Sequence, residues 1–518
     1  MSDKPKPPWL TSPLPPPRHL AAVRTNRQMT DEPAGEQANT RVPTPRLPEP
    51  APAAPQDAQA VDYTLVRRLH ERVVREQATM LHATASDDPV AVAERERIVT
   101  RVVGVWVDEQ RRQRRITPAY EDALLAAVMA EIAGLGRLQQ LLDDPTIENI
   151  TILGCDGVRI EYRDGRIASA PPVADSDDDL VALVANLARR AADSGSTERS
   201  LSPSQPMLDL QLKDGSRLTA IYQVSQRPVV VIRRHGALAV TLPDLVGPSF
   251  DMLDPLLADF LTAAMAARLN VLVAGWPGAG KTTLVRALAA EIPRHEWFVT
   301  MEESRELGLH TTGAHPWAVS LEAREGHGDL GMDGRPVGEI TLDDMIPLSL
   351  RLNTSRVIVG EVRSREIVAM LQAMGTTGGS LATIHSRGPQ MVMDRVVELV
   401  LAHRGEHSVQ RAFRQVAGAV DLIVYVEMID ETAIGGRKHR FVSHVLEVDG
   451  LFPDGDGVRT TTVFGPADGQ SGRAVPQHLP ERHVNRLRRV GYDPGVLNQY
   501  RGVGRWPRRL DTIVGGGG

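Results

Sequence analysis

The most constraining feature of the chain is a glycine-rich loop at residues 275–282, which reads Gly-Trp-Pro-Gly-Ala-Gly-Lys-Thr. The loop matches the phosphate-binding pattern G-x-x-x-x-G-K-[ST]. The apolar run 271–274 before it is typical of a buried strand, and the stretch 283–288 after it has a helical pattern. In this order, backbone N–H groups of the loop close around phosphate oxygens at the start of the helix. The loop therefore predicts an α/β domain that binds a phosphorylated ligand.

Residues of the loop have distinct expected roles. Lys281 supplies a positive charge for the β and γ phosphates of ATP, and the Thr282 hydroxyl is placed to bind Mg²⁺. The chain has only five lysines against fifty-four arginines, yet it keeps a lysine here, where a guanidinium would not fit the loop. The expected nucleotide-binding residues of this segment are Gly275, Pro277, Gly278, Ala279, Gly280, Lys281, Thr282 and Thr283.

Composition argues against several other classes of protein. A net charge of −6 argues against a dedicated nucleic-acid binder, which is normally basic overall or on one face. The single cysteine, Cys155, excludes a disulfide framework and a multi-cysteine zinc module. No run of about 18 apolar residues appears, so no membrane span is expected, and the N-terminus lacks the apolar region of a secretory signal. We therefore expect a cytoplasmic protein, which could still dock on a membrane protein.

The length of 518 residues predicts two or three domains, and changes in composition and periodicity mark their limits. Residues 1–58 hold 14 of the 37 prolines and few large apolar side chains, which predicts a disordered or polyproline-II tail. The expected segments are the proline-rich tail at 1–58, a helical region at 59–140, an α+β domain at 141–245, an α/β ATPase domain at 246–430 and a C-terminal extension at 431–518.

The patterns also predict individual elements. A helix is expected to start at Pro118 with Thr117 as its cap, and hairpins are expected at 158–167 and 208–224. In the ATPase domain the expected strands lie near 270–274, 297–301, 356–360, 381–385 and 422–426. Several of these runs are apolar throughout, which suits a parallel sheet covered on both faces. In the extension, strands are expected near 441–448 and 458–464 and a basic helix near 481–490, as a docking module or as a loosely ordered decoration.

Three of the expected strands end in side chains suited to nucleotide hydrolysis. Glu302, Glu361 and His385 follow the strands near 297–301, 356–360 and 381–385. One glutamate at a strand end is usually only a solvated residue. Ligands of parallel sheets bind at the carboxyl ends of the strands, however, and hydrolysis needs carboxylates for Mg²⁺ and for the attacking water. Three such ends beside a phosphate loop therefore indicate a catalytic site.

The same segments carry a family resemblance. Residues 299–307 resemble the acidic box of the type II/type IV secretion ATPases, usually I-E-D-x-x-E-L. Residues 356–363 look like their Walker B segment, R-I-I-V-G-E-V-R, and residues 379–385 are similar to their histidine box, G-S-x-x-T-x-H. Among the branches of this family, the chain resembles most the CpaF-like branch, which powers tight-adherence (Tad/Flp) pilus assembly. Elements similar to that branch are L-x-D-P-x-V-T-E-I at 142–150, D-G-S-R at 214–217 and T-I-R-K at 231–234.

The resemblance, which covers about residues 140–426, implies a smaller α+β domain followed by a RecA-like phosphate-loop ATPase domain with a parallel-rich sheet. It implies ATP and Mg²⁺ as ligands, with Arg233 approaching the phosphates, Thr282 and Glu302 at the metal, and Glu302 and Glu361 acting on Mg²⁺ and the attacking water. His385 would sense the γ-phosphate. The candidate charge stabilisers are Arg324, Arg351 and Arg363.

The expected partners also follow from the resemblance. The chain would form a homo-oligomer, a hexameric ring, and would act on inner-membrane pilus or secretion platform proteins. Its expected location is cytoplasmic, with peripheral attachment at the inner face of the membrane, and nucleic acid is not an expected partner.

The chain departs from the family pattern at two places. Glu303 stands where the family has aspartate, which leaves Glu302 as the candidate active carboxylate. Residues 373–379 form a shorter turn than the family's T-G-H-x-G and lack its histidine. Three functions therefore stay open: a motor ATPase for pilus assembly or secretion, a conjugative DNA- or protein-transfer ATPase, and a non-hydrolysing scaffold that ATP closes. The short turn at 373–379 is the feature that favours the scaffold.

Overall fold

The computed structural model describes residues 61–80, 89–132, 135–193, 201–203, 205–212, 214–234, 239–324, 326–332, 334–364, 366–403, 408–467 and 472–513. The chain divides into two compact units, Met1–Ala54 and Pro55–Gly518, and only the second contains described residues. The proline-rich tail predicted for residues 1–58 lies outside them. Among the described residues, no helix is both long and apolar enough to cross a membrane.

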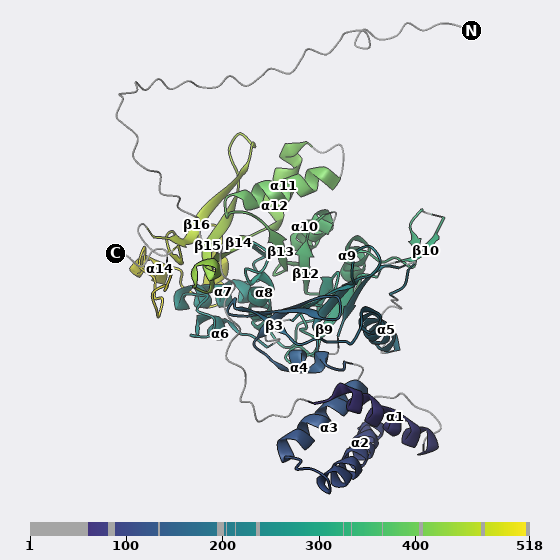
Figure 1. The fold of residues 1–518 in the computed structure, drawn as a ribbon. Coiled ribbons are helices and arrows are strands. Elements are labelled where there is room, and N and C mark those ends of the chain that lie inside the picture. Colours follow the sequence, from purple (N-terminus) through teal and green to yellow (C-terminus); the bar gives the residue numbers. More distant parts are fainter. Residues whose placement is uncertain are drawn as a thin grey trace, which may run out of the picture. The chain divides into compact units, whose positions relative to one another are not determined.

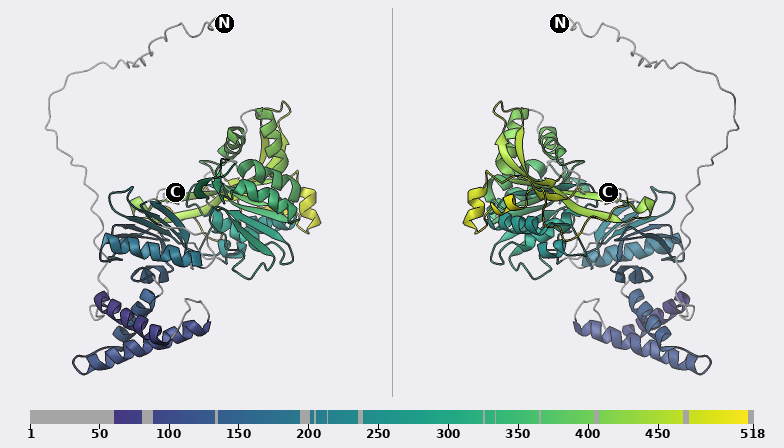
Figure 2. Two further views of the ribbon diagram at one scale, coloured as in Figure 1. Left: turned by 90° about the vertical axis from the view of Figure 1, so that its right-hand side faces the viewer. Right: turned by 90° about the vertical axis from the view of Figure 1, so that its left-hand side faces the viewer.

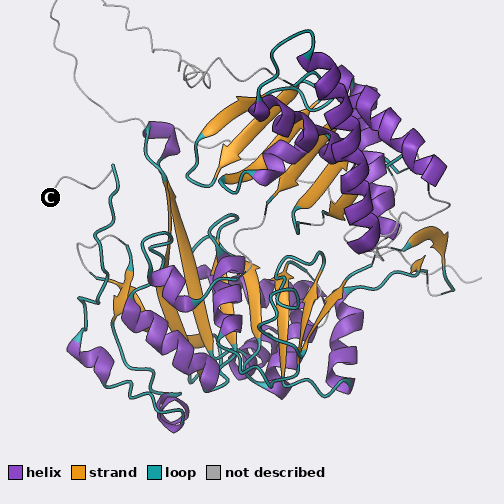
Figure 3. Ribbon diagram, turned by 90° about the horizontal axis from the view of Figure 1, so that it is seen from below, coloured by secondary structure: helices purple, strands orange, loops and turns teal. Residues whose placement is uncertain are grey.

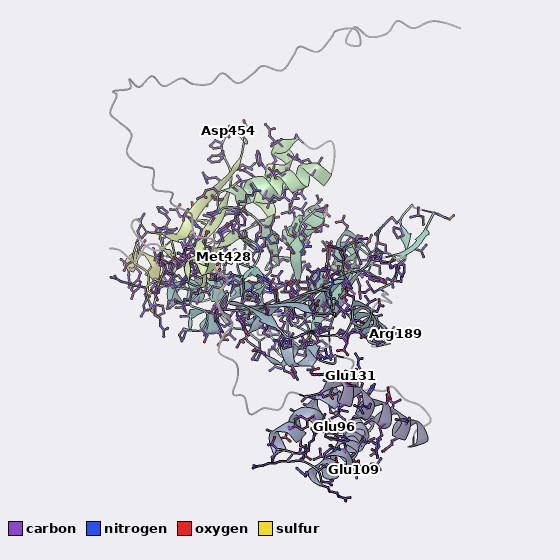
Figure 4. All side chains as sticks on the ribbon, in the orientation of Figure 1. Glu96, Glu109, Glu131, Arg189, Met428 and Asp454 are labelled. Atoms are coloured by element: carbon purple, nitrogen blue, oxygen red, sulfur yellow. The ribbon has the colours of Figure 1, made fainter. Side chains whose placement is uncertain are left out.

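The first described elements are three helices, α1 (Tyr63–Met80), α2 (Pro89–Arg111) and α3 (Pro118–Ile132), which pack around their own apolar core. The backbone N–H of Tyr120 donates to Thr117 Oγ1 over 3.2 Å, which confirms Thr117 as the cap of α3. Glu96 and Glu109 on α2, labelled in Figure 4, are exposed. The predicted helical character of this region is confirmed.

A six-stranded antiparallel sheet follows, with the strand order β3-β2-β1-β6-β5-β4. Its edge strand β3 is labelled in Figure 1. Its strands are β1 (Ile147–Leu153), β2 (Gly157–Tyr162), β3 (Ile167–Ala170), β4 (Met207–Gln211), β5 (Arg217–Ile221) and β6 (Val229–Arg233). Both predicted hairpins are present, as β2–β3 and β4–β5. The helices α4 (Leu138–Asp143) and α5 (Asp177–Asp193) pack on the sheet through buried leucines and valines.

The second sheet has nine strands in the order β17-β16-β15-β14-β7-β13-β12-β8-β9. The strands of both sheets are drawn in orange in Figure 3. The six strands from β14 to β9 are parallel to one another, and the remaining pairs are antiparallel. The nine strands are β7 (Val271–Gly275), β8 (Phe298–Glu302), β9 (Ala318–Glu322), β12 (Arg356–Val362), β13 (Leu381–His385), β14 (Leu422–Asp430), β15 (Lys438–Leu451), β16 (Val458–Pro466) and β17 (Ala474–Pro476). The five strands predicted for the ATPase domain are all confirmed.

Helices cover both faces of this sheet (Figures 1 and 2). Side chains of one strand point alternately to the two faces, so Val271 and Val273 of β7 join one core, while Leu272 and Ala274 join the other. The first core is closed by α6 (Leu242–Val246), α7 (Pro255–Ala266) and α8 (Lys281–Ala290), and the second by α9 (Leu342–Arg351), α10 (Glu366–Thr377), α11 (Met391–His403) and α12 (Val409–Ala419). The predicted α/β class, with a parallel-rich sheet buried on both faces, is confirmed.

The sheet continues beyond residue 430, where the sequence suggested a separate extension. β14 pairs with β15 along its whole length, from Leu422 opposite Glu447 to Asp430 opposite Lys438. The short helices α13 (Val484–Arg489) and α14 (Val496–Gln499) follow, and the indole N–H of Trp506 donates to the Ala474 carbonyl over 2.8 Å. The described part of the last thirty residues therefore packs on the sheet. A change of composition near 430 cannot reveal strand pairing, because pairing depends on residues distant in sequence.

The remaining strands are β10 (His327–Leu330) and β11 (Pro336–Val337), which form a small antiparallel hairpin between β9 and α9.

Candidate active site

The candidate site lies where four neighbouring parallel strands end. β7 leads into the phosphate loop, and β13, β12 and β8 follow it in order across the sheet. Gly275 and His385 are direct neighbours at the ends of β7 and β13, Glu361 lies near the end of β12, and Glu302 ends β8. Because the strands are parallel, these ends meet at one edge of the sheet, as the sequence predicted.

A cavity of about 1050 Å³ opens at this edge. Most of the predicted site residues line it, namely Pro277, Gly278, Gly280, Lys281, Thr282, Thr283, Arg233, Glu302, Glu361 and His385. Two of the expected ligands, Gly275 and Ala279, do not. Ala279 is fully buried in the apolar core, and a Cβ on Gly275 would lie 2.3 Å from the Val426 carbonyl oxygen. Gly275 therefore allows β14 to approach β7 closely.

The start of α8 depends on the local conformation of Gly280. This residue caps the helix with φ of 99°, a left-handed conformation that favours glycine. The helix begins at Lys281, so the first backbone N–H groups after Gly280 have no acceptor within the helix. Gly280, Lys281, Thr282 and Thr283 all line the cavity, so the start of the helix adjoins it, which is the arrangement that binds phosphate.

A chain of polar contacts joins the phosphate loop to the strand ends. Lys281 Nζ donates to the carbonyls of Gly275, over 3.2 Å, and Trp276, over 3.0 Å, and lies 3.0 Å from His385 Nδ1. An ammonium group can only donate, so His385 Nδ1 is the acceptor and Nε2 carries the ring proton. His385 Nε2 lies 2.5 Å from Glu361 Oε1. His385 therefore accepts from Lys281 through Nδ1 and contacts Glu361 through Nε2.

The electrostatics of this chain fit a site for an anion. Burial lowers the pKa of Lys281 to about 8, so that its charge is costly until an anion neutralises it. Burial would raise the pKa of Glu361, but contacts with His385 and Arg363 outweigh burial and lower it to about 2. Arg363 Nη2 lies 2.5 Å from Glu361 Oε2. Glu361 is therefore ionised at neutral pH, with its carboxylate fixed from two sides.

Glu302 lies in a different environment from Glu361. Its carboxylate is buried, and Oε1 accepts the backbone N–H groups of Glu306, over 2.9 Å, and Leu307, over 2.8 Å. Its second oxygen, Oε2, is buried without a hydrogen-bond partner. Burial raises the pKa of Glu302 to about 7, against the opposing effect of the two backbone donors. A carboxylate with one hydrogen-bonded oxygen and one oxygen without a partner can take up a proton or bind a cation.

Arg286 of α8 stabilises the turn at Glu306 and Leu307, whose N–H groups bind Glu302. Its Nε donates to the Leu307 carbonyl over 3.2 Å, and Nη2 donates to the Glu306 carbonyl. Arg286 is 3% exposed, so these bonds lie in a region of low dielectric. The sequence does not predict this role of Arg286, because the helical pattern of residues 283–288 does not show which side chains will bind the carbonyls of a turn distant in sequence.

The oxygen groups at this edge fit Mg²⁺. Thr282 lines the cavity at the first turn of α8, and Glu302 Oε2 is a carboxylate oxygen without a hydrogen-bond partner, which could serve as a metal ligand. Mg²⁺ typically takes one or two protein ligands and completes its shell with phosphate and water oxygens. Within the described ranges no cluster of three or more histidine, cysteine or acidic side chains could hold a metal by itself.

Only part of the predicted arginine set reaches the cavity. Arg233 and Arg363 line it, whereas Arg324 and Arg351 do not. Arg324 donates to the Gly338 carbonyl over 2.6 Å beside the β10–β11 hairpin, and Arg351 is exposed at the end of α9. The cationic side chains that line the cavity are Arg163, Arg217, Arg233, Arg234, Lys281, Arg286, Arg363, Arg437, Lys438 and Arg440, against the six carboxylates of Glu148, Asp164, Glu302, Glu303, Glu306 and Glu361. This excess of cations suits a polyphosphate.

The shortened turn at residues 373–379 lies away from this chemistry. The turn ends α10 and leads into the amino end of β13, whereas His385 stands at the carboxyl end of that strand. No residue of 373–379 lines the cavity. The sequence feature that favoured a non-hydrolysing scaffold is therefore remote from the candidate site.

Comparison with known proteins identifies the family. A family model described as Type II/IV secretion system protein matches residues 133–449, more than half of the chain. The chain belongs to this family. The family resemblance inferred from the acidic, Walker B and histidine boxes is thereby confirmed, and the match does not resolve the branch.

Several relatives are similar over long stretches. A putative conjugal transfer protein of Mycobacterium tuberculosis is 28% identical over 364 residues, which cover 69% of this chain and 95% of that protein. The type IV secretion system protein PtlH of Bordetella pertussis is 29% identical over 280 residues, 49% of this chain and 78% of PtlH. Alignments with two uncharacterised proteins of Methanocaldococcus jannaschii, 24% and 31% identical, cover 68% and 50% of this chain but only 58% and 34% of those proteins.

Similar solved structures include the VirB11 ATPase of the Brucella suis type IV secretion system, which is 23% identical, with a TM-score of 0.31, over 65% of this chain and 98% of that one. The Legionella pneumophila ATPase DotB is 16% identical, with a TM-score of 0.42, over 60% of this chain and 79% of DotB.

Proposed function

We propose that the protein is an ATPase that uses Mg²⁺·ATP hydrolysis to power pilus assembly or protein secretion through a membrane platform. The observation that carries the proposal is the contact chain from Lys281 through His385 to Glu361, at adjacent strand ends beside a phosphate loop. Membership of the type II/IV secretion family supports it.

The side chains divide the work of hydrolysis between them. The phosphate loop and Lys281 hold the β and γ phosphates, and the surrounding arginines stabilise charge on the transferring phosphoryl group. Thr282 and Glu302 would hold Mg²⁺, which when bound neutralises charge on the phosphates. Glu361 is ionised at neutral pH and orients the attacking water, because its pKa is too low for it to keep a proton.

His385 links the ligand to this machinery. A γ-phosphate that draws Lys281 away from His385 Nδ1 removes one of the two contacts that fix the ring. The contact with Glu361 then changes with it. His385 is thus proposed to report the presence of the γ-phosphate to the Walker B carboxylate.

The finer assignment that we propose is the CpaF-like branch, acting as a hexameric ring at the inner face of the cytoplasmic membrane. Its support is the set of elements at 142–150, 214–217 and 231–234, and the absence of a tetracysteine module in a chain with one cysteine. The ring and the platform partner are inferred from the family.

A conjugative transfer ATPase is the second candidate. It is favoured by the relative named a putative conjugal transfer protein, which the alignment covers over 95% of its length. A net charge of −6 stands against DNA as the direct partner. Titration with fluorescent single- and double-stranded DNA separates the two, because a conjugative motor that handles DNA should bind it with strong salt dependence.

The experiment that tests hydrolysis is a comparison of ATP binding and phosphate release in the full chain and in Glu361→Gln. The variant should bind ATP normally and lose turnover, since glutamine keeps the size of the side chain but not its charge. Glu398→Gln, on an exposed glutamate of α11, is the matched control. Native chain that binds ATP without any turnover would contradict the motor and favour the scaffold.

A further inference from the structure

Two cationic residues of β15, which lie outside the family motifs, also line the cavity. Lys438 and Arg440 lie two residues apart on β15, so their side chains leave the same face of the strand. Both line the cavity. Each contacts a glutamate of the six-stranded sheet: Lys438 Nζ contacts Glu161 of β2, and Arg440 contacts Glu148 of β1.

Arg440 uses its guanidinium on two different partners. Its Nε donates to the Gly278 carbonyl of the phosphate loop over 2.8 Å. Its Nη2 lies 3.2 Å from each carboxylate oxygen of Glu148. The two side chains are 24% and 19% exposed, so solvent competes little for these bonds. One planar group therefore joins the loop to β1, which a lysine could not do with the same geometry.

The bond from Arg440 to Gly278 restricts a peptide of the phosphate loop that has high conformational freedom. Gly278 has φ of 74° and no side chain to restrict it. The N–H of the peptide between Gly278 and Ala279 donates to the Trp276 carbonyl over 3.2 Å. With Arg440 on the carbonyl, the peptide between Gly278 and Ala279 is held at both ends. Its oxygen is thereby kept bonded to a cation.

The β2–β3 and β14–β15 hairpins also approach each other closely at their turns. A Cβ on Gly165, in the β2–β3 turn, would lie 2.4 Å from Thr432 Cγ2 in the β14–β15 turn. Gly165 has φ of 92°, so the turn itself favours glycine. Three contacts, at Glu148, Glu161 and Gly165, thus connect the six-stranded sheet to the strand that carries Arg440.

We propose that Arg440 is a positioning residue that preorganises the phosphate loop for nucleotide and ties the conformation of that loop to the six-stranded sheet through Glu148. The proposal rests on the nucleotide binding proposed above. Arg440 acts through Gly278, and it depends on Glu148 to hold its guanidinium in place.

The positioning role predicts whether nucleotide affinity rises or falls when the charge of Glu148 is removed. If Arg440 served only as a cation near the phosphates, Glu148→Gln would remove a repelling carboxylate and tighten nucleotide binding, and Arg440→Lys would bind as well as the native chain. If Arg440 positions the loop, Glu148→Gln weakens binding and Arg440→Lys weakens it too, because neither variant keeps the two-sided contact.

The test is calorimetric titration of the full chain with Mg²⁺·ADP, which measures binding without hydrolysis. Arg440→Gln should weaken binding on the order of tenfold, the lower end for a hydrogen bond from a charged group. Glu148→Gln should weaken it in the same direction, and the double variant should be no worse than Arg440→Gln, since the two residues act as one unit. Arg459→Gln, on the neighbouring strand β16 and paired with Asp449, is the control and should bind normally.

The outcomes separate the proposals. Tighter binding by Glu148→Gln, or native binding by Arg440→Lys, overturns the positioning role while nucleotide binding stands. Variants with lower melting temperatures and unchanged ADP affinity also overturn it, because they show a structural role alone. A native chain that binds neither ADP nor ATP overturns the proposed function itself.

Discussion

Replacing Glu302 by glutamine should stabilise the protein at pH 8 and change its stability little at pH 5. The carboxylate is buried, and burial raises its pKa to about 7 in the folded chain. An unfolded chain ionises the same group near an ordinary glutamate value, about 4.3. The folded state therefore disfavours the ionised form, and this destabilisation develops as the pH rises from the unfolded pKa to the folded one. Glutamine has no charge to bury.

The magnitude follows from the two pKa values. Ionisation of Glu302 should cost the folded state roughly 3 kcal/mol at pH 8 and about 1 kcal/mol or less at pH 5. Glutamine keeps an acceptor for the N–H groups of Glu306 and Leu307, so the turn should persist. For a domain of this size the gain corresponds to a melting temperature about 6–12 °C higher at pH 8.

The assay is thermal unfolding of both chains without nucleotide at pH 5 and pH 8, followed by circular dichroism. Glu303→Gln, on the exposed neighbour, controls for the substitution itself. The same Glu302 variant should lose ATP turnover, since a buried carboxylate kept at a cost in stability indicates a functional role. A melting difference that is the same at both pH values would refute the reasoning, and so would a variant less stable than the native chain at pH 8.

Three further results are expected. His385→Asn keeps an acceptor for Lys281 but loses the contact with Glu361, so it should lower kcat on the order of tenfold to a hundredfold while ADP affinity changes little; unchanged kcat would remove His385 from the mechanism. Calorimetry of Mg²⁺·ADP binding at pH 8, in two buffers of different ionisation enthalpy, should show uptake of about half a proton as Lys281 recharges; no uptake would contradict its lowered pKa. Arg356→Met should cost about 1.5–3 kcal/mol of stability, because it removes the two nitrogens that bind the half-buried Glu296 carboxylate at 2.8 Å and leaves that carboxylate to Ser355 and Arg268. Stability recovered in the double variant with Glu296→Gln would support that cause, and an unaffected single variant would contradict it.

Sequence reasoning located the site because its chemistry stands at strand ends. The buried runs before Gly275, Glu302, Glu361 and His385 are mostly apolar, and parallel strands must end at a common edge. Topology alone then brings the four ends together. The prediction needed no knowledge of side-chain geometry.

The same reasoning failed where a residue's role depends on a partner distant in sequence. Arg324 and Arg351 looked as suitable as Arg363, yet they bind a carbonyl beside a hairpin or face solvent. Arg286 and Arg440 lie outside every motif and nevertheless line the cavity, because tertiary packing brings them to the carbonyls of turns. A chain with fifty-four arginines offers no signal that separates these cases.

The roles assigned to the two glutamates depend on burial, which the motifs do not encode. Both stand at the ends of mostly apolar strands, but Glu361 is held between His385 and Arg363, whereas Glu302 has one buried oxygen without a hydrogen-bond partner. The pKa of one is lowered and the pKa of the other is raised. Their different expected functions therefore follow from the structure.

The most direct test of the central claim is Mg²⁺-dependent ATP hydrolysis as a function of protein concentration, for the native chain and for Lys281→Ala. A motor ATPase whose subunits complete one another's sites should show turnover per chain that rises with concentration and is lost in the variant. Native chain that binds ATP but shows no turnover at any concentration, or a Lys281→Ala variant as active as the native chain, would contradict the account.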